Sequence, residues 1–245
     1  MPQEITHAME REFTVTEHLE ELRRRIIISL AVIIAVTLAS FPASSTILKI
    51  LKYPSAGFIE RLVYFAPEEA FLLYMRVSFV AGLIISFPVI MFQLWAFLSP
   101  AIEERIKKHA LLFVAFSTIV FILGCAFAYF ILLPTALKFL LSMGKGELEP
   151  VISATRYISF VTGFMLACGL VFEMPVLSFF LTKIKLISAR MLRRQFKYAA
   201  VIIVIAAAVI TPTADAFNMI LLALPMIVLY EASIWVSFFA GKGIE

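Results

Sequence analysis

The sequence predicts an all-α protein that crosses a membrane several times. Hydrophobic residues make up 62% of the 245-residue chain and charged residues 16%, whereas a soluble domain carries about 25% charged residues. The apolar runs are far longer than the strands of a membrane β-barrel, and they lack the alternation of period two. Because a backbone in lipid must satisfy its own hydrogen bonds, helices are the remaining solution. We therefore expect residues 1–245 to form a single integral membrane domain.

Six apolar segments are expected to span the membrane. A full span needs roughly 20 residues, so the fifth segment is short, and the sequence Thr211-Pro212-Thr213 ends it sharply. The fifth and sixth segments are therefore expected to form a squat hairpin that thins the bilayer locally. The expected spans are residues 26–41, 71–94, 110–133, 158–181, 199–210 and 217–239.

The first span is expected to be retained rather than cleaved as a signal peptide. A stretch rich in small residues, 39–43, lies at the end of this span and is typical of a cleavage site. However, the 22 residues before this span contain six acidic side chains, whereas a signal peptide begins with a positively charged segment. This difference favours a retained helix.

The fourth span contains Glu173 as its only formally charged side chain. A charge at the centre of a bilayer costs roughly 2.5–3.5 kcal/mol on insertion scales, so such groups usually face a protein interior or a water-filled cavity. Pro175 follows two residues later and should kink the helix beside the carboxylate. Glu173 is therefore a candidate functional residue, with a structural hydrogen bond to a neighbouring helix as the alternative.

Lysine and arginine predict the orientation of the chain. Fourteen of the 21 basic residues lie before the first span, in the second and fourth connections, and in the carboxy-terminal tail. By the positive-inside rule, both termini are therefore cytoplasmic. The same rule accounts for the net charge of +4 without a nucleic-acid partner. The two long connections on the other side, residues 42–69 and 134–156, are expected to form short interfacial helices.

The sequence shows no motif for covalent or cofactor chemistry. It contains no glycine-rich phosphate loop, no cluster of metal ligands and no nucleophile elbow. Cys125 and Cys168 fall inside apolar runs and are interpreted as packing residues. We expect no catalytic residue, no metal and no cofactor. Internal repeats are not evident, which disfavours a transporter built from inverted repeats.

The segment before the first span carries both acidic and basic side chains. If Thr16 caps a helix, Glu17, Glu20, Glu21 and Arg24 lie within one or two turns at the cytoplasmic end of the span. The pattern alone leaves two interpretations open. One is a solvated face whose Glu–Arg pairs are worth roughly 0.2–0.5 kcal/mol each, and the other is a functional site.

Several short motifs, in their order along the six expected spans, resemble the TatC family, the multispanning core of the twin-arginine protein translocase. The resemblance covers residues 16–243. Each motif is weak alone, but their order and spacing make the match specific. The motifs are His18–Arg23, Phe87–Ile90, Gln93–Phe97, Ala126–Phe130, Phe172–Pro175, Leu222–Met226 and Gly241–Gly243.

The resemblance implies a function in binding and assembly. A TatC protein lies in the cytoplasmic (inner) membrane of a prokaryote, has a glove-like concave arrangement of helices, and receives precursor proteins whose signal peptides carry paired arginines. It organises single-span TatA- and TatB-type partners in an oligomeric complex, and the proton gradient drives export of the folded precursor. The residues alone leave one alternative from another class, a proton-coupled secondary transporter that uses Glu173.

The resemblance also implies which residues bind the signal peptide. Family carboxylates in the amino-terminal segment and in the first cytoplasmic loop receive the arginine pair, and the first of them maps onto Glu21. The loop position of the family falls on Ile106, so the nearby Glu103 and Glu104 are the candidate second acceptors. Phe97 matches an aromatic residue beside the signal-peptide site. A guanidinium suits this role because its planar fork binds a carboxylate bidentately and stays charged.

Glu173, Asp215 and Glu231 are the candidates for an intramembrane cavity or partner contact. By the resemblance, Glu173 matches an intramembrane glutamate on the concave side, and Glu231 matches a position on the last span. Many relatives have glutamine where this sequence has Met219, so a polar contact expected there is missing or displaced. Asp215 lies nearby in the sequence.

Overall fold

The computed structural model describes residues 15–56, 59, 62–98, 110–144, 151–211 and 215–241, and helices dominate it. The predicted all-α, polytopic membrane fold is confirmed. In the described part of the chain, five helical segments are long and apolar enough to cross a membrane, and α10 (Phe196–Ile210) is a shorter apolar helix. The five long segments are Glu17–Ser55, Pro67–Leu98, Ala110–Ser142, Ala154–Lys183 and Ala216–Gly241.

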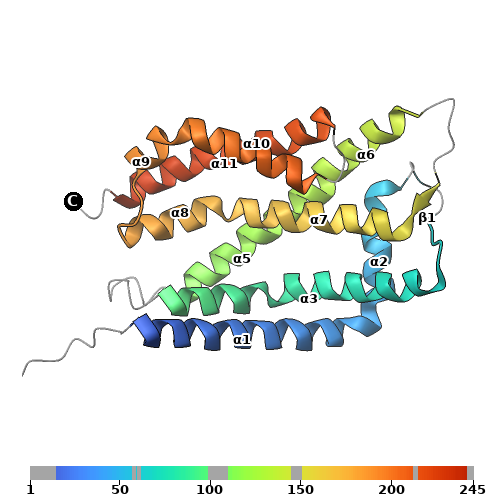
Figure 1. Ribbon diagram of the computed structural model, residues 1–245, viewed down its shortest axis with the longest axis horizontal. Helices are drawn as coiled ribbons and strands as arrows, with labels where there is room; N and C mark the ends of the chain where they lie inside the picture. Colours follow the sequence, from blue (N-terminus) through green and yellow to red (C-terminus); the bar gives the residue numbers. More distant parts are fainter. Residues whose placement is uncertain are drawn as a thin grey trace, which may run out of the picture.

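Figure 1 labels the elements that make up these segments. Short 3-10 turns flank the helix Ser44–Lys52, and a π-helical turn, Ala128–Leu132, joins the helix Ala110–Phe127 to the helix Leu133–Ser142. In chain order the other helices are α1 (Val15–Ser40), α2 (Ser44–Lys52), α3 (Pro67–Leu98), α5 (Ala110–Phe127), α6 (Leu133–Ser142), α7 (Ala154–Phe172), α8 (Met174–Lys183), α9 (Ala189–Arg194) and α11 (Ala216–Gly241).

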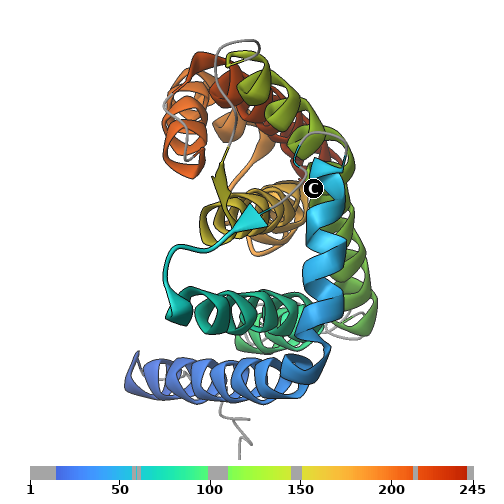
Figure 2. The ribbon, with the colours of Figure 1, turned by 90° about the vertical axis from the view of Figure 1, so that its right-hand side faces the viewer.

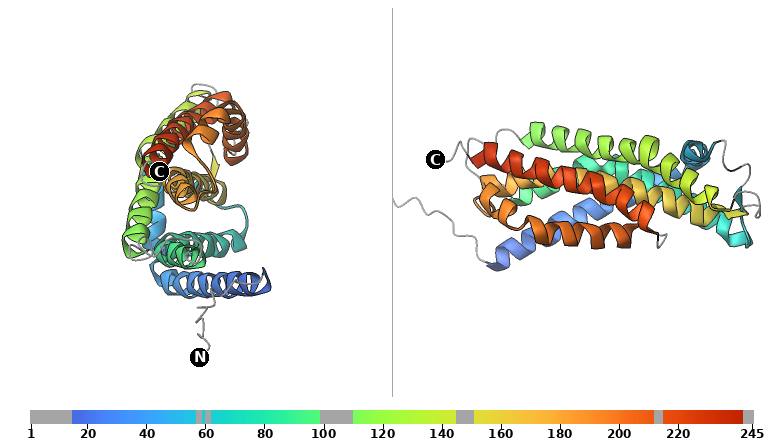
Figure 3. Two further views of the ribbon diagram at one scale, coloured as in Figure 1. Left: turned by 90° about the vertical axis from the view of Figure 1, so that its left-hand side faces the viewer. Right: turned by 90° about the horizontal axis from the view of Figure 1, so that it is seen from above.

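The helices follow a curve rather than closing around a common axis. α1 begins at the same end of the molecule where α9 lies and α11 ends, and α2 lies at the opposite end (Figure 1). Seen from that opposite end, α2, α5 and α6 form one side, and α1, α3 and α7 are stacked beside them (Figure 2). From above, α11 runs between the α5–α6 segment and α10 (Figure 3).

The two long connections at the α2 end contain short helices, as predicted. α2 lies in the first connection, and α6 extends the third apolar segment as far as Ser142 in the second. The connections also pair through two strands that the sequence did not predict, β1 (Leu62–Val63) and β2 (Ile152–Ser153). These strands are parallel, with Leu62 opposite Ile152. The two connections therefore form one structural unit.

Small residues bring the long helices into close contact. A Cβ on Gly82 of α3 would lie 2.3 Å from Thr37 Oγ1 of α1, and a Cβ on Gly124 of α5 would lie 2.6 Å from the Cys168 carbonyl of α7. Lipid tails are as apolar as the helix surfaces, so helix association in a membrane depends on such packing and on interhelical hydrogen bonds. Glycine at these positions fixes the crossings of α1 with α3 and of α5 with α7.

Candidate functional site

Glu21 lies near the start of α1 and is held by a neighbouring arginine. Arg25, one turn later, donates from Nε to Glu21 Oε1 at 3.1 Å and also from Nη2 to the same oxygen. The third nitrogen, Nη1, donates to Oε1 of Gln93 on α3 at 3.3 Å. Arg25 thus connects the carboxylate to the neighbouring helix. The Glu21 side chain stays 24% exposed, so a solvent-borne group can reach it.

An aromatic contact lies at the same end of these two helices. The His18 ring on α1 stacks on the Phe97 ring on α3, with 4.3 Å between the ring centroids. The structure therefore brings two predicted signal-peptide residues, Glu21 and Phe97, to one end of the α1–α3 pair. The other two predicted residues, Glu103 and Glu104, lie outside the described residues.

Glu173 interrupts the fourth apolar segment, as its position before Pro175 predicted. It is the single residue between α7 and α8, and it caps both helices. The side chain is 3% exposed, and Ser117 of α5 donates to its Oε2 at 2.6 Å. Its second oxygen, Oε1, is buried and has no hydrogen-bond partner among the described residues. The carboxylate therefore lies inside the protein with one acceptor oxygen unused.

Asp215 caps the start of α11. Its Oδ1 accepts from the Asn218 backbone N–H at 2.8 Å, and its Oδ2 accepts from Asn218 Nδ2 at 2.9 Å. The next residue, Met219, is half-buried and packs against the hydrophobic core. Asp215 and Asn218 thus form the polar group at this end of the helix, and Met219 follows them directly in the sequence.

Glu231 lies toward the other end of α11 and contacts α9. Arg193 Nη2 lies 2.8 Å from Glu231 Oε1, and the neighbouring Tyr230 hydroxyl donates to the Leu192 carbonyl at 2.9 Å. Both partners of the ion pair are exposed, at 61% for Arg193 and 40% for Glu231. Glu231 therefore helps to hold α9 on α11 while remaining open to solvent.

The predicted residues do not form one cluster. Glu21 and Phe97 lie at one end of α1 and α3, Glu173 lies between α7 and α8, and Asp215 and Glu231 lie toward opposite ends of α11. Within the described ranges, no three His, Cys, Asp or Glu side chains are grouped closely enough to hold a metal ion. The predicted residues therefore lie in separate polar groups on different helices.

The sequence did not reveal the hydrogen bonds between helices. Ser178 donates to the Ser233 carbonyl at 3.0 Å, and the Thr182 and Ser237 hydroxyls are 2.7 Å apart, which links α8 to α11. The spacing of four residues on both helices is the one signal that could have indicated this ladder. The sequence also gave no sign that Ser117 is the partner of Glu173.

Comparisons with known proteins identify the family. The family model described as Sec-independent protein translocase protein (TatC) matches residues 17–225. The TatC protein of Carboxydothermus hydrogenoformans is 34% identical over 230 residues, which cover 94% of this chain and 95% of that protein. The TatC protein of Aquifex aeolicus is 38% identical over 233 residues, which cover 93% of this chain and 96% of that protein.

A solved structure agrees with these relatives. The crystal structure of a twin-arginine translocase receptor, TatC, superposes with a TM-score of 0.83 at 36% sequence identity, and it covers 91% of this chain and 99% of that chain. These comparisons support the TatC family and not the alternative of a proton-coupled transporter. This chain belongs to the TatC family and is a multi-pass membrane component of twin-arginine protein translocation, not an enzyme.

Proposed function

We propose that this protein is the receptor that binds the paired arginines of signal peptides at the start of α1 and the end of α3. The proposal rests on the Glu21 carboxylate, which is partly exposed and already accepts hydrogen bonds from the guanidinium of Arg25. A group that binds Arg25 in this way has the charge and position to bind an arginine of a peptide. The stacked rings of His18 and Phe97 provide an aromatic surface at the same end of α1 and α3.

Arg25 is the internal competitor of the signal peptide in this proposal. Its Nε and Nη2 both donate to Glu21 Oε1, and nothing among the described residues donates to Oε2. An incoming guanidinium can therefore bind Oε2 first and then share or displace Arg25. The pair is only partly exposed, at 24% for Glu21 and 23% for Arg25, so displacing Arg25 costs more than the roughly 0.3–0.5 kcal/mol of an exposed pair on a helix.

Two arginines require a second acceptor, which we assign to Glu104 or Glu103. Both residues follow α3 in the sequence, and α3 carries Gln93 and Phe97 at its last two turns. In the sequence the two loop carboxylates come within six residues of the end of α3 at Leu98. One carboxylate can satisfy only one guanidinium fork well, so the pair of acidic groups matches the pair of arginines.

We assign partner binding to the other acidic candidates. TatA- and TatB-type single-span proteins are the partners that the family resemblance implies, in an oligomeric complex whose export is driven by the proton gradient. The buried and unused Oε1 of Glu173 is an acceptor that a polar partner group or water can fill. Glu231 and Asp215 offer further polar contacts at the two ends of α11.

The proposed orientation places both termini in the cytoplasm, in the cytoplasmic (inner) membrane of a prokaryote. Residues 1–245 act as one integral membrane domain with six spans, the fifth of them short. The grouping of the α1 start, α9 and the α11 end on one side (Figure 1) supports this orientation, because the basic residues around α9 belong on the cytoplasmic side.

Site-specific crosslinking tests the proposal. A synthetic signal peptide with a photoreactive group beside its arginine pair should form adducts with residues 18–25 and 93–97 of the full chain in lipid. Replacing the two arginines with lysines should remove most of these adducts, because an ammonium ion cannot bind a carboxylate bidentately. Equal yields from both peptides, or adducts confined to the α2 end of the molecule, would contradict the proposal.

A further inference from the structure

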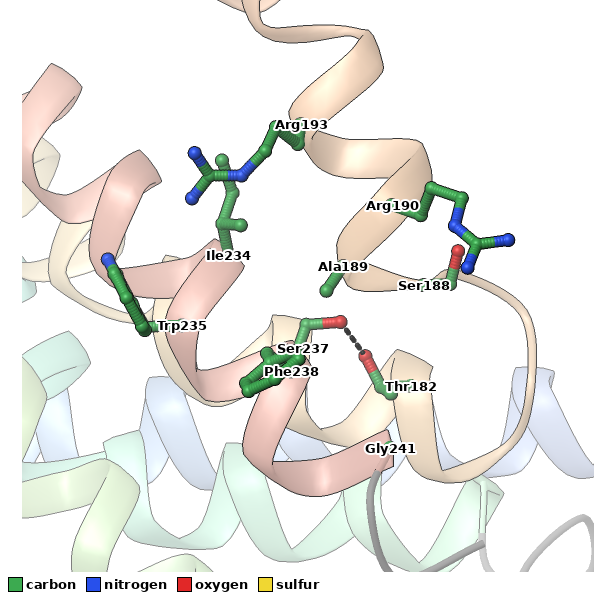
Figure 4. A pocket seen from close by; sticks show the side chains of 10 residues that line it. All are labelled: Thr182, Ser188, Ala189, Arg190, Arg193, Ile234, Trp235, Ser237, Phe238 and Gly241. Carbon is green, nitrogen blue, oxygen red and sulfur yellow. Dashed lines mark hydrogen bonds between the residues drawn. The ribbon is translucent and has the colours of Figure 1, made fainter. Parts of the chain in front are cut away.

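A cavity of about 670 Å³ lies between α8, α9 and α11, away from the proposed signal-peptide site (Figure 4). Its polar lining includes Arg190, Arg193 and Ser188, and its apolar lining includes Trp235 and Phe238. Ligand-binding cavities in proteins usually measure about 300–1,000 Å³. The cavity thus has the size of a small-molecule site, and its lining combines cationic and aromatic side chains.

The segment around this cavity has a surplus of positive charge. Residues 183–197 contain six lysines and arginines and no acidic residue. Among the described residues of α8 to α11, the acidic side chains are Asp215 and Glu231, and Asp215 lies at the far end of α11. Glu231 alone faces the basic group, through its ion pair with Arg193. The basic residues around the cavity would therefore attract an anion.

The two arginines of the lining are available for an anion. Arg190 is exposed and makes no hydrogen bond or ion pair within the described part of the chain. Arg193 uses Nη2 for Glu231, in an exposed pair of the kind that is worth about 0.2–1 kcal/mol, and its other donors remain open. In Figure 4 the Arg193 side chain reaches toward Ile234 of α11, whereas the Arg190 guanidinium lies on the other side of α9, beside Ser188.

The position of the cavity indicates that its ligand comes from the membrane. Trp235, on the apolar wall, is 53% exposed, and aromatic residues of this kind gather at the headgroup level of a bilayer. The cavity lies at the last turns of α8 and α11, next to Gly241, where both apolar segments end. Basic pockets between membrane helices at this level bind the headgroups of anionic lipids.

We propose that this cavity binds the headgroup of an anionic phospholipid. Arg190, beside Ser188, donates charge-assisted hydrogen bonds to the phosphate diester, and Arg193 adds positive charge on the α11 side of the cavity. Trp235 and Phe238 cover the first part of an acyl chain. A zwitterionic headgroup binds less well because its ammonium group would face the same basic residues. The cavity is independent of the Glu21 site, since no residue of α1 or α3 lines it.

Lipid retention by the intact protein tests this proposal. The full chain in detergent would be titrated with phosphatidylglycerol or phosphatidylcholine, and the bound lipid counted by native mass spectrometry. We expect one retained phosphatidylglycerol per protein at low lipid concentration, and little retained phosphatidylcholine. Arg190→Gln should raise the concentration for half-occupancy about tenfold, because one charge-assisted contact is lost.

Lys185→Gln is the matched control, since it removes one charge from the same segment outside the cavity lining. It should change half-occupancy less than about twofold, the size of a weak surface electrostatic effect. Equal retention of both lipids, or equal half-occupancy for Arg190→Gln and the control, would overturn the proposal. Displacement of the lipid by millimolar inorganic phosphate would show a site for free anions instead, and would overturn it as well.

Discussion

The hydrogen bond from Ser117 to Glu173 predicts the effect of removing a single oxygen atom. Ser117 is fully buried, and its hydroxyl lies 2.6 Å from Glu173 Oε2, a distance in the range of charge-assisted O–H···O bonds. Hydrogen bonds to charged groups contribute about 1.5–3 kcal/mol to stability. Ser117→Ala leaves the buried carboxyl group with no donor among the described residues. We therefore expect the free energy of unfolding to fall by about 1.5–3 kcal/mol.

Ser86→Ala is the control for this substitution. Ser86 is also buried, at 1% exposure, but its hydroxyl has no hydrogen-bond partner among the described residues. Removing an unsatisfied polar group should leave stability unchanged or raise it. Unfolding of both variants in mixed detergent micelles, followed by tryptophan fluorescence and circular dichroism, compares them directly. Equal loss of stability in the two variants would refute the assignment of the Ser117–Glu173 bond.

Five further substitutions test the binding, orientation and partner proposals. Arg25→Gln removes the internal competitor of Glu21, so the affinity for a twin-arginine peptide, measured by fluorescence titration, should rise at least about twofold. In inverted and right-side-out vesicles, a cysteine at Met143 should react with an impermeant maleimide from outside, and a cysteine at Leu186 from the cytoplasmic side. Both native residues are exposed. Glu173→Gln keeps an acceptor oxygen and should retain export of a twin-arginine reporter, whereas Glu173→Leu should impair export and co-purification of partners.

Each of these predictions has a clear contrary result. Weaker peptide binding by Arg25→Gln would mean that this arginine orients Glu21 instead of competing for it. Labelling of the two cysteines from the same side would contradict the proposed topology. Loss of export in both Glu173 variants, with partners still bound, would indicate that the carboxyl group must take up and release a proton.

The sequence was sufficient to predict those features of the structure that depend on the chemistry of neighbouring residues. Long apolar runs predicted the helices, and the Glu173–Pro175 pair predicted the interruption between α7 and α8, because a proline removes a backbone donor wherever it lies. The spacing of Glu21 and Arg25 is also local, and an ion pair one helical turn apart can be read from it. The family motifs added the assignment of function.

Contacts between distant segments could not be predicted in the same way. The β1–β2 pair joins residues 90 positions apart, such as Leu62 and Ile152, and each strand has only two residues, too short for a recognisable alternation. Ser117 was one of many hydroxyl residues within apolar runs, and only the crossing of α5 with α7 brings it to Glu173. The basic cavity likewise depends on how α9 packs against α11. Such features are set by tertiary packing.

The affinity of the protein for paired arginines tests the central claim most directly. Full-length protein in lipid nanodiscs would be titrated with a signal peptide that carries two arginines, and with the same peptide carrying two lysines. We expect a clear preference for the arginine peptide, and a loss of about tenfold in its affinity in Glu21→Gln, which removes one charge-assisted acceptor. Unchanged affinity in a folded Glu21→Gln protein, with the same preference for arginine, would contradict the assignment of this site.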